Sequence, residues 1–110
     1  MKQREIWLAD LNPSAGSEQN GIRPVVIISG NAMNDNLEIS IICPLSSKIK
    51  RYAGCLVLQK NNINGLDKNS EILTFQIRTI SSARFIRKLG EISKEELYGI
   101  KKNLLEILTF

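Results

Sequence analysis

The chain has 110 residues, of which 43% are hydrophobic and 24% are charged. This length suits one domain, residues 1–110, and this composition argues against bulk disorder. The formal net charge of +4 permits a polyanionic partner without demanding one. The sequence has no histidine, which removes the commonest general base, the commonest metal ligand and every nucleophile that histidine activates.

Targeting signals are missing from the sequence. No stretch has the roughly 18–20 apolar residues of a membrane span, so no membrane association is expected. The charged residues 1–5 are not followed by the apolar segment of a signal peptide. The sequence therefore predicts a cytoplasmic protein. The two cysteines, Cys43 and Cys55, have apolar neighbours and are expected to be buried thiols, with a disulfide or a redox pair as the alternative.

The first third of the chain predicts two strands separated by a polar loop. Residues 5–11 read as a strand that contains Trp7, which we expect in the core or in an interface. A polar, glycine-containing loop, residues 12–21, follows. Residues 23–29 are rich in Val and Ile and predict a strand buried on both faces. The polar connection at 31–36 has room for one helical turn.

Short strands and turns alternate in the middle of the chain. Residues 38–43 predict a strand that ends at Pro44, and the basic segment 46–52 predicts a loop or a ragged edge. Residues 54–58 read as another strand. Residues 61–65 are dense in Asn and Gly, as is typical of turns.

A longer strand, a final strand and a helix complete the expected elements. Residues 71–80 alternate, which puts one set on a single face: Leu73, Phe75 and Ile77. Residues 84–92 predict the last strand.

The expected helix begins at Ser93, because Glu96 three residues later completes a capping box. Its apolar residues follow at helical spacing and form a packing stripe that a second subunit could share: Leu97, Ile100, Leu104 and Leu108. Gly99 interrupts this helix, and we expect it to sit against another backbone. The pattern as a whole predicts a mostly β fold, a small curved sheet or barrel with a C-terminal helix.

Arg23 is the main candidate for a binding residue. It stands between a glycine-containing loop and the root of a buried strand, where an arginine can bind an anion such as phosphate. The alternative is a structural arginine that pairs with Glu18 or Asp10. Ser46 and Ser47 read either as turn formers or as hydroxyls directed at the same anion.

Two basic clusters read either as solvated faces or as local positive patches. They are Lys48, Lys50 and Arg51, and later Arg78, Arg84, Arg87 and Lys88. Aromatic residues are scarce, with one Trp, two Tyr and three Phe, so an extended platform for stacking bases is not indicated.

Several motifs follow one another in the order of one known family. Residues 5–13 contain Trp and then Asp-Leu-Asn-Pro, and residues 16–29 contain Gly-Ser-Glu-Gln and then Arg-Pro before the hydrophobic strand. Residues 43–47 read Cys-Pro-Leu-Ser-Ser, and residues 76–80 read Gln-Ile-Arg-Thr-Ile. In these motifs, and over nearly its whole length, the chain resembles the MazF/PemK family of toxins from bacterial toxin–antitoxin systems.

The resemblance implies both a fold and an activity. The fold is mostly β with short helices, an SH3-like small barrel with a C-terminal helix. The resemblance also implies that the protein works as a homodimer. The activity is that of a sequence-selective, metal-independent endoribonuclease that needs no cofactor and cuts single-stranded RNA, chiefly mRNA. The partner is an antitoxin whose C-terminal segment blocks the RNA groove, and the toxin–antitoxin complex binds DNA.

The resemblance also implies roles for single residues. Arg23 takes the place of the family's catalytic arginine and Ser46 that of its catalytic threonine, so the hydroxyl is kept and the methyl is lost. Glu18 is our candidate for the general base or for a group that orients Arg23. The residues expected to bind RNA are Asn12, Ser17, Gln19, Ser47, Lys48, Lys50, Arg51, Gln76 and Arg78. No residue is expected to bind a metal.

Two other interpretations stay open on the sequence. A toxin of the same fold could poison DNA gyrase, as CcdB-type toxins do, but those act through a C-terminal Trp-Gly-Ile and this chain ends Ile-Leu-Thr-Phe. A catalytically inactive RNA-binding homologue is the second. Ser46 in place of threonine and Ser81 in place of an acid favour it.

Overall fold

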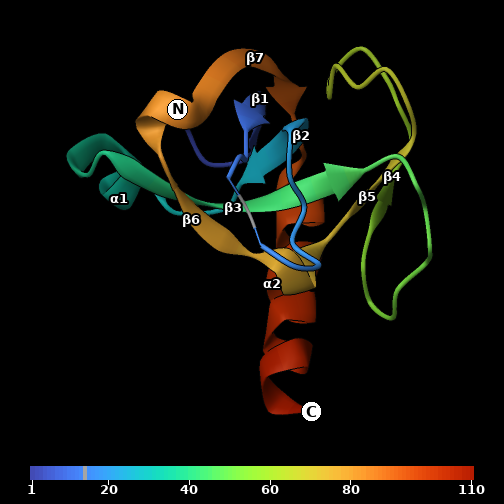
Figure 1. Ribbon diagram of the computed structural model, residues 1–110. Helices are drawn as coiled ribbons and strands as arrows, with labels where there is room; N and C mark the ends of the chain where they lie inside the picture. The colour runs from blue at the N-terminus through green and yellow to red at the C-terminus, as the bar shows by residue number, and fades with distance from the viewer. Residues whose placement is uncertain (14) are drawn as a thin grey trace.

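A computed structural model describes residues 1–13 and 15–110 of the chain (Figure 1). Ser14, which belongs to the loop expected at 12–21, lies outside the described residues. The strands are β1 (Glu5–Asp10), β2 (Ile22–Ile27), β3 (Ile39–Ser46), β4 (Val57–Leu58), β5 (Ser70–Ile72), β6 (Arg78–Ser81) and β7 (Phe85–Glu91). The helices are α1 (Asn31–Asn36) and α2 (Lys94–Thr109), with single 3₁₀ turns η1 (Thr74–Gln76) and η2 (Ser82–Arg84).

The strands form one strongly curled antiparallel sheet, in the order β4-β5-β3-β2-β1-β7, with β6 also paired to β3. Figure 1 shows β3 running across the centre of this sheet and α2 passing behind it. Beyond the sheet, α2 continues to the C-terminus and projects from the body of the molecule. The expected mostly β fold with a C-terminal helix is thus confirmed.

The expected end of a strand at Pro44 is wrong, because β3 continues to Ser46. Proline lacks an N–H group and usually ends a central strand. Here Pro44 lies where β3 changes partners, since it is the last residue paired with β2 and the next residue, Leu45, pairs with Ile72 of β5. The carbonyl oxygen of Pro44 still accepts a hydrogen bond from the N–H of Leu73, at 2.9 Å.

The single strand expected at 71–80 is also wrong, because the chain turns within it. Both β5 and β6 pair with β3, but three positions separate Leu45 from Ile42 on β3, whereas six separate their partners Ile72 and Arg78. The turn η1 takes up the difference. Phe75 therefore lies 44% exposed instead of packing with the buried Leu73.

The core has two parts, one on each face of the central strands. One part lies between the sheet and α2 and contains Val26, Cys43 and Ile100. The other contains Val25 and Ile27, with Trp7 and Phe85 packed against it. Adjacent residues of β2 belong to different parts, which confirms that this strand is buried on both faces. The rings of Trp7 and Phe85 meet edge to face at 5.7 Å.

The capping box at the start of α2 is confirmed. The Ser93 hydroxyl accepts a hydrogen bond from the N–H of Glu96 at 3.0 Å, and the Glu96 carboxylate accepts one from the N–H of Ser93 at 2.8 Å. The expected packing stripe extends over only the first part of the helix, because Leu97 and Ile100 are buried whereas Leu108 is 82% exposed. Gly99 faces the side chain of Leu56, not a backbone as expected.

Both cysteines carry free thiols, so the disulfide alternative is wrong. Cys43 is buried as expected, and its burial, together with the nearby Cys55, raises its pKa to about 12. Cys55 is only half-buried. In the described part of the chain, neither helix has the length and apolar character needed to cross a bilayer.

Candidate active site

Arg23 lies in β2, where the chain enters the sheet from the loop 12–21, and it pairs with Ala9 of β1. Its Nε donates a hydrogen bond to the carbonyl oxygen of Asn20 at 2.6 Å. Among the described residues, no carboxylate forms an ion pair with Arg23, so the alternative pairing with Glu18 or Asp10 is wrong. The guanidinium charge is therefore available to an external anion.

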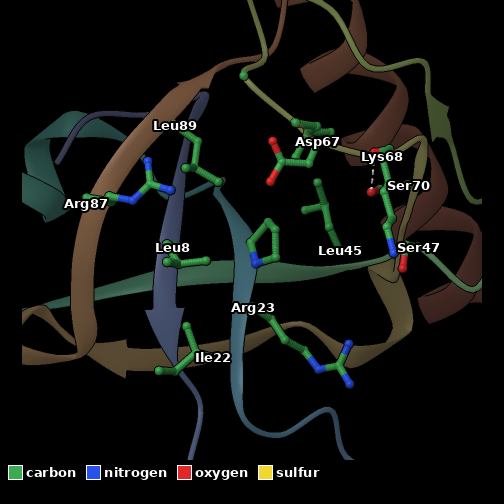
Figure 2. Close-up of a pocket in the computed structure, with 13 residues that line it drawn as sticks. Leu8, Ile22, Arg23, Leu45, Ser47, Asp67, Lys68, Ser70, Arg87 and Leu89 are labelled. Carbon is green, nitrogen blue, oxygen red and sulfur yellow. Dashed lines mark hydrogen bonds between the residues drawn. The ribbon is translucent and has the colours of Figure 1, made fainter.

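A cavity of about 360 Å³ opens beside Arg23 (Figure 2). Its lining combines an apolar centre with cations at the margin: Leu8, Pro24, Leu45, Leu66 and Leu89, with Arg23, Lys68 and Arg87. Asp67 adds one acid. In the view of Figure 2 the Arg23 guanidinium is directed away from Leu8 and Leu89. No sequence motif pointed to Lys68, which follows the turn at 61–65.

The two serines near Arg23 differ in exposure. Ser46 is 7% exposed, and its hydroxyl oxygen accepts a hydrogen bond from the N–H of Lys48 at 3.2 Å. Ser47 is exposed and lines the cavity together with Arg23. Along the strands, Ser46 and Arg23 both lie two residues beyond the last pair of β2 and β3, Val25 with Pro44, at the same end.

Glu18 contacts a different arginine from the one expected. Its carboxylate lies 3.7 Å from Nη1 of Arg78, so the hypothesis that it orients Arg23 is wrong. Both residues line a second cavity, of about 510 Å³, together with Ala15, Ser17, Phe75, Gln76 and Ile77. The predicted residues are thus divided between two cavities.

Gln76 ties the loop 12–21 to η1. Its side-chain oxygen accepts a hydrogen bond from the N–H of Gln19 at 2.7 Å, and its amide donates to the carbonyl oxygen of Ser17 at 3.3 Å. Gln76 thereby holds the loop over the second cavity. Ser17 and Gln19 take part in these hydrogen bonds through their backbones, so their side chains do not contact Gln76 through these bonds.

Asn12 has a structural role at the neck of the same loop. Its side-chain oxygen accepts a hydrogen bond from the N–H of Gly21 at 3.0 Å, so it closes the two ends of the loop. Arg84 reinforces this closure from below, because its guanidinium donates to the carbonyl oxygens of Asp10 and Asn12. The predicted RNA contact of Asn12 finds no separate support in this geometry.

The basic residues Lys48, Lys50 and Arg51 are exposed on the segment between β3 and β4. This segment is anchored by Glu71 of β5, which pairs with Ser46 and is fully buried. The Glu71 carboxylate accepts hydrogen bonds from three consecutive backbone N–H groups, those of residues 50, 51 and 52, at 2.9, 3.2 and 2.8 Å.

Sequence reasoning missed the role of Glu71. The sequence carried little signal, because Glu71 follows the polar residues 67–70 and only Ile72 and Leu73 after it are apolar.

Metal ligands do not gather in the described residues. Within residues 1–13 and 15–110, no three Cys, Asp or Glu side chains lie close enough together to hold a metal ion.

The sequence matches known proteins over nearly its full length. Residues 2–108 match the family described as PemK-like, MazF-like toxin of type II toxin–antitoxin system. The chain is 36% identical over 109 residues to endoribonuclease MazF of Staphylococcus saprophyticus, covering 97% of this chain and 89% of that protein. It is 32% identical over 109 residues to endoribonuclease MazF9 of Mycobacterium tuberculosis, covering 94% of this chain and 92% of that protein.

Solved structures share the fold. MazF of Deinococcus radiodurans superposes with a TM-score of 0.82 at 24% identity, covering 99% of this chain and 96% of that one. A mycobacterial endoribonuclease, solved in complex with its cognate antitoxin, superposes with a TM-score of 0.80 at 18% identity, covering 98% of this chain and 94% of that one. The small curled barrel expected from the motifs is thereby confirmed. The match of the family over residues 2–108, together with these sequence relatives, shows that the chain belongs to the PemK/MazF family of toxins of type II toxin–antitoxin systems.

Proposed function

We propose that the protein is an endoribonuclease that cuts single-stranded RNA, chiefly mRNA, at selected sequences. The observation that carries this proposal is that Arg23 has no ion pair among the described residues, lines a cavity that also contains Lys68 and Arg87, and lies at the same strand ends as Ser46. The names of the two sequence relatives, both endoribonucleases, support the same conclusion.

The proposed reaction is attack by the 2′-hydroxyl of the RNA on the adjacent phosphorus. A bond forms from O2′ to phosphorus and the bond from phosphorus to O5′ breaks, which gives a 2′,3′-cyclic phosphate and a 5′-hydroxyl. The 2′ proton passes to a base, and the leaving O5′ gains a proton. Because the nucleophile already lies beside the phosphorus, no water needs to be activated by a metal ion.

Arg23 supplies electrostatic stabilisation in this scheme. Its planar guanidinium can donate two parallel hydrogen bonds to the phosphoryl oxygens as their charge grows. Arginine keeps its proton at any physiological pH, so Arg23 is not the base. Ser46 would donate a hydrogen bond to the same phosphoryl group. Its burial means that the RNA must approach closely at the ends of β2 and β3, and the exposed Ser47 can donate beside it.

The base and the flanking phosphate contacts come from the second cavity and the basic segment. Glu18 is the proposed base, since its side chain is 56% exposed in a loop that also contacts Gln76. Arg78, Lys48, Lys50 and Arg51 would bind phosphates on either side of the cut, through charge and without reading sequence.

The proposed partners follow from the family and its solved complexes. We infer that the protein binds an antitoxin, which the mycobacterial endoribonuclease solved with its cognate antitoxin and the MazE–MazF structure of Deinococcus radiodurans support. We also propose that this antitoxin covers the RNA-binding surface. We further infer that the protein is a homodimer and acts in the cytoplasm, where mRNA is found. DNA binding would belong to the complex with the antitoxin.

The test is cleavage of a long single-stranded RNA in EDTA by the purified protein and by two variants. We expect wild-type protein to leave 2′,3′-cyclic phosphate and 5′-hydroxyl ends at a recurring sequence. Loss of a comparable charge-stabilising donor lowers kcat by about 100- to 1000-fold, so Arg23→Ala should fall by that amount. Arg23→Lys, which keeps the charge but loses the fork, should recover only part of the rate.

Lys101→Ala is the control, because Lys101 is an exposed cation on α2 that lines neither cavity and has no proposed role in binding RNA. Equal cutting by wild type and Arg23→Ala would show a contaminating nuclease and reject the proposal. RNA binding without any cutting by the wild type would favour the inactive RNA-binding homologue.

A further inference from the structure

Two exposed aromatic rings that are distant in the sequence meet at the surface. Tyr52 belongs to the segment between β3 and β4, and Phe75 belongs to η1. Their ring centroids lie 4.8 Å apart at an interplanar angle of 71°, an edge-to-face contact. The two residues are 46% and 44% exposed, so about half of each surface faces outward. The scarcity of aromatics in the sequence gave no hint of this pair.

Glu71 holds Tyr52 in this position. Its carboxylate accepts the N–H groups of residues 50, 51 and 52, and the Tyr52 bond is the shortest of the three, at 2.8 Å. Arg51, between them, has a φ of 56°, in the left-handed region that non-glycine residues rarely occupy. Consecutive N–H groups that converge on an anion, with one residue in this region, form a nest. A buried carboxylate thus fixes a strained turn so that the ring next to it is preorganised.

The surroundings of the pair are cationic and contain an unused donor. Lys50 and Arg51 precede Tyr52 in the chain and are exposed. Phe75 lines the cavity of about 510 Å³ that also contains Arg78. Nη1 of Arg78 is buried, lies 3.7 Å from Glu18, and has no hydrogen-bond partner among the described residues. The Arg78 side chain as a whole is 25% exposed, so part of it is accessible to a ligand.

We propose that Tyr52 and Phe75, held by Glu71, form a stacking site for one unpaired base of the RNA, whose neighbouring phosphate binds Arg78. This inference rests on the proposed function, since it names a contact that the same RNA would make. Glu71 is a positioning residue in this site: it is fully buried, and both of its oxygens are occupied by the nest, so it touches no RNA.

An unpaired base fits these features better than an apolar protein side chain does. Every base offers a π face that can stack on an aromatic ring, and each is joined to a phosphate that the surrounding cations attract. A purely apolar segment would make no use of the cations around the pair, Lys50, Arg51 and Arg78. The edge-to-face pair is already ordered, so little side-chain entropy is lost when a base binds.

The test measures binding without cleavage. The probe is a fluorescein-labelled, mixed-sequence RNA oligonucleotide with 2′-O-methyl groups throughout, which keeps its bases and phosphates but lacks the attacking hydroxyl. Its Kd is measured by fluorescence anisotropy at several salt concentrations. Base–aromatic stacking is sequence-tolerant and substantial, so Tyr52→Leu and Phe75→Leu should each weaken binding about tenfold. Tyr52→Phe, which keeps the ring, should bind like the wild type.

The salt dependence separates stacking from charge. Removal of a phosphate contact reduces the slope of log Kd against log salt, whereas removal of a stacking contact lowers affinity and leaves the slope unchanged. We therefore expect an unchanged slope for Tyr52→Leu and a reduced slope for Arg78→Ala. Tyr98→Leu is the matched control, since it makes the same substitution at the chain's other tyrosine, on α2.

Glu71→Gln tests the positioning role. The amide keeps one oxygen but cannot accept all three N–H groups with a full charge, so the ring of Tyr52 should lose its fixed place and RNA affinity should fall. In the Tyr52→Leu background the same change should have a smaller further effect on Kd, because the ring is gone and only Lys50 and Arg51 can still be displaced. A purely structural role would instead give equal losses in both backgrounds.

The outcomes distinguish this inference from the proposed function. Unchanged Kd values for both Tyr52→Leu and Phe75→Leu would overturn the stacking site. The cleavage result with Arg23→Ala is independent, because the 2′-O-methyl probe cannot be cut and its binding does not require catalysis.

Discussion

Glu5 in β1 is a carboxylate surrounded by donors. Burial raises the pKa of Glu5. Hydrogen bonds from Trp7 and from the N–H of Lys2, together with the ammonium of Lys88, lower this pKa by a larger amount, so it lies below its ordinary value. A carboxylate whose pKa is depressed by folding stabilises the folded state above its unfolded pKa, and this stabilisation is lost as the pH falls through the folded pKa.

The prediction at this residue concerns pH. Glu5→Gln should lower Tm at pH 7. The difference in Tm between this variant and the wild type should shrink as the pH falls below about 4, because Glu5 of the wild type then becomes protonated, first in the unfolded chain and at lower pH in the folded protein. Thermal unfolding followed by circular dichroism between these pH values gives the comparison. Glu91→Gln, at the exposed position that pairs with Glu5 on β7, serves as control. A Tm difference that stays constant with pH would contradict the assigned charge interactions.

Single residues were predictable where their role is local. Arg23 stands at the root of a strand beside a glycine loop, and that position alone indicated an anion site. The partner of Glu18 was not predictable, because it depends on how the loop 12–21 folds against β6. Glu71 was missed for the same reason, since the N–H groups that it accepts come from residues 19 to 21 positions earlier.

The capping box of α2 allows a prediction at the scale of one element. Replacement of a capping serine by alanine costs about 1 kcal/mol, which corresponds to a decrease in Tm of about 4 °C or more in a domain of this size. We expect this loss for Ser93→Ala, because its hydroxyl accepts the N–H of Glu96. Ser93→Asp, which keeps an acceptor, should stay close to wild type. If both variants melt alike, the cap does not stabilise this helix.

Elements were predicted well where the signal lies within one segment and poorly where pairing decides. The start of α2 is coded by Ser93 and Glu96, three residues apart. Alternation through 71–80 described only the local chain, whereas β5 and β6 have different registers on β3 and force the turn η1 between them. Pro44 looked like an end because the change of partner strands around it is a non-local event.

At the scale of the whole molecule, β3 brings the candidate site together. It pairs with β2, which carries Arg23, with β5, which carries Glu71, and with β6, which begins at Arg78. The motifs gave Arg23 and Arg78 in order along the chain, but not Glu71. Their division between two cavities follows from the curl of the sheet, which no single segment encodes.

The far end of α2 offers a surface for the proposed homodimer. This end projects from the sheet (Figure 1), and it exposes Leu105, Leu108 and Phe110, which are 67%, 82% and 101% exposed. A leucine that moves from water into an interface contributes about 1.5–3 kcal/mol, and a two-fold interface counts each residue twice. Burial of this stripe against a second copy would therefore stabilise a dimer strongly.

Leu108→Glu should accordingly convert the dimer into a monomer of 12.4 kDa at concentrations where the wild type sediments with twice that mass. Sedimentation equilibrium over a range of concentrations measures both species. Leu37→Glu is the matched control, because Leu37 is also an exposed leucine but lies at the end of α1. If Leu108→Glu retains the mass of the wild type, the dimer uses another surface. If the wild type sediments as a monomer at every concentration, the homodimer itself is rejected. The exposed apolar end of α2 would then mark a surface for a different partner.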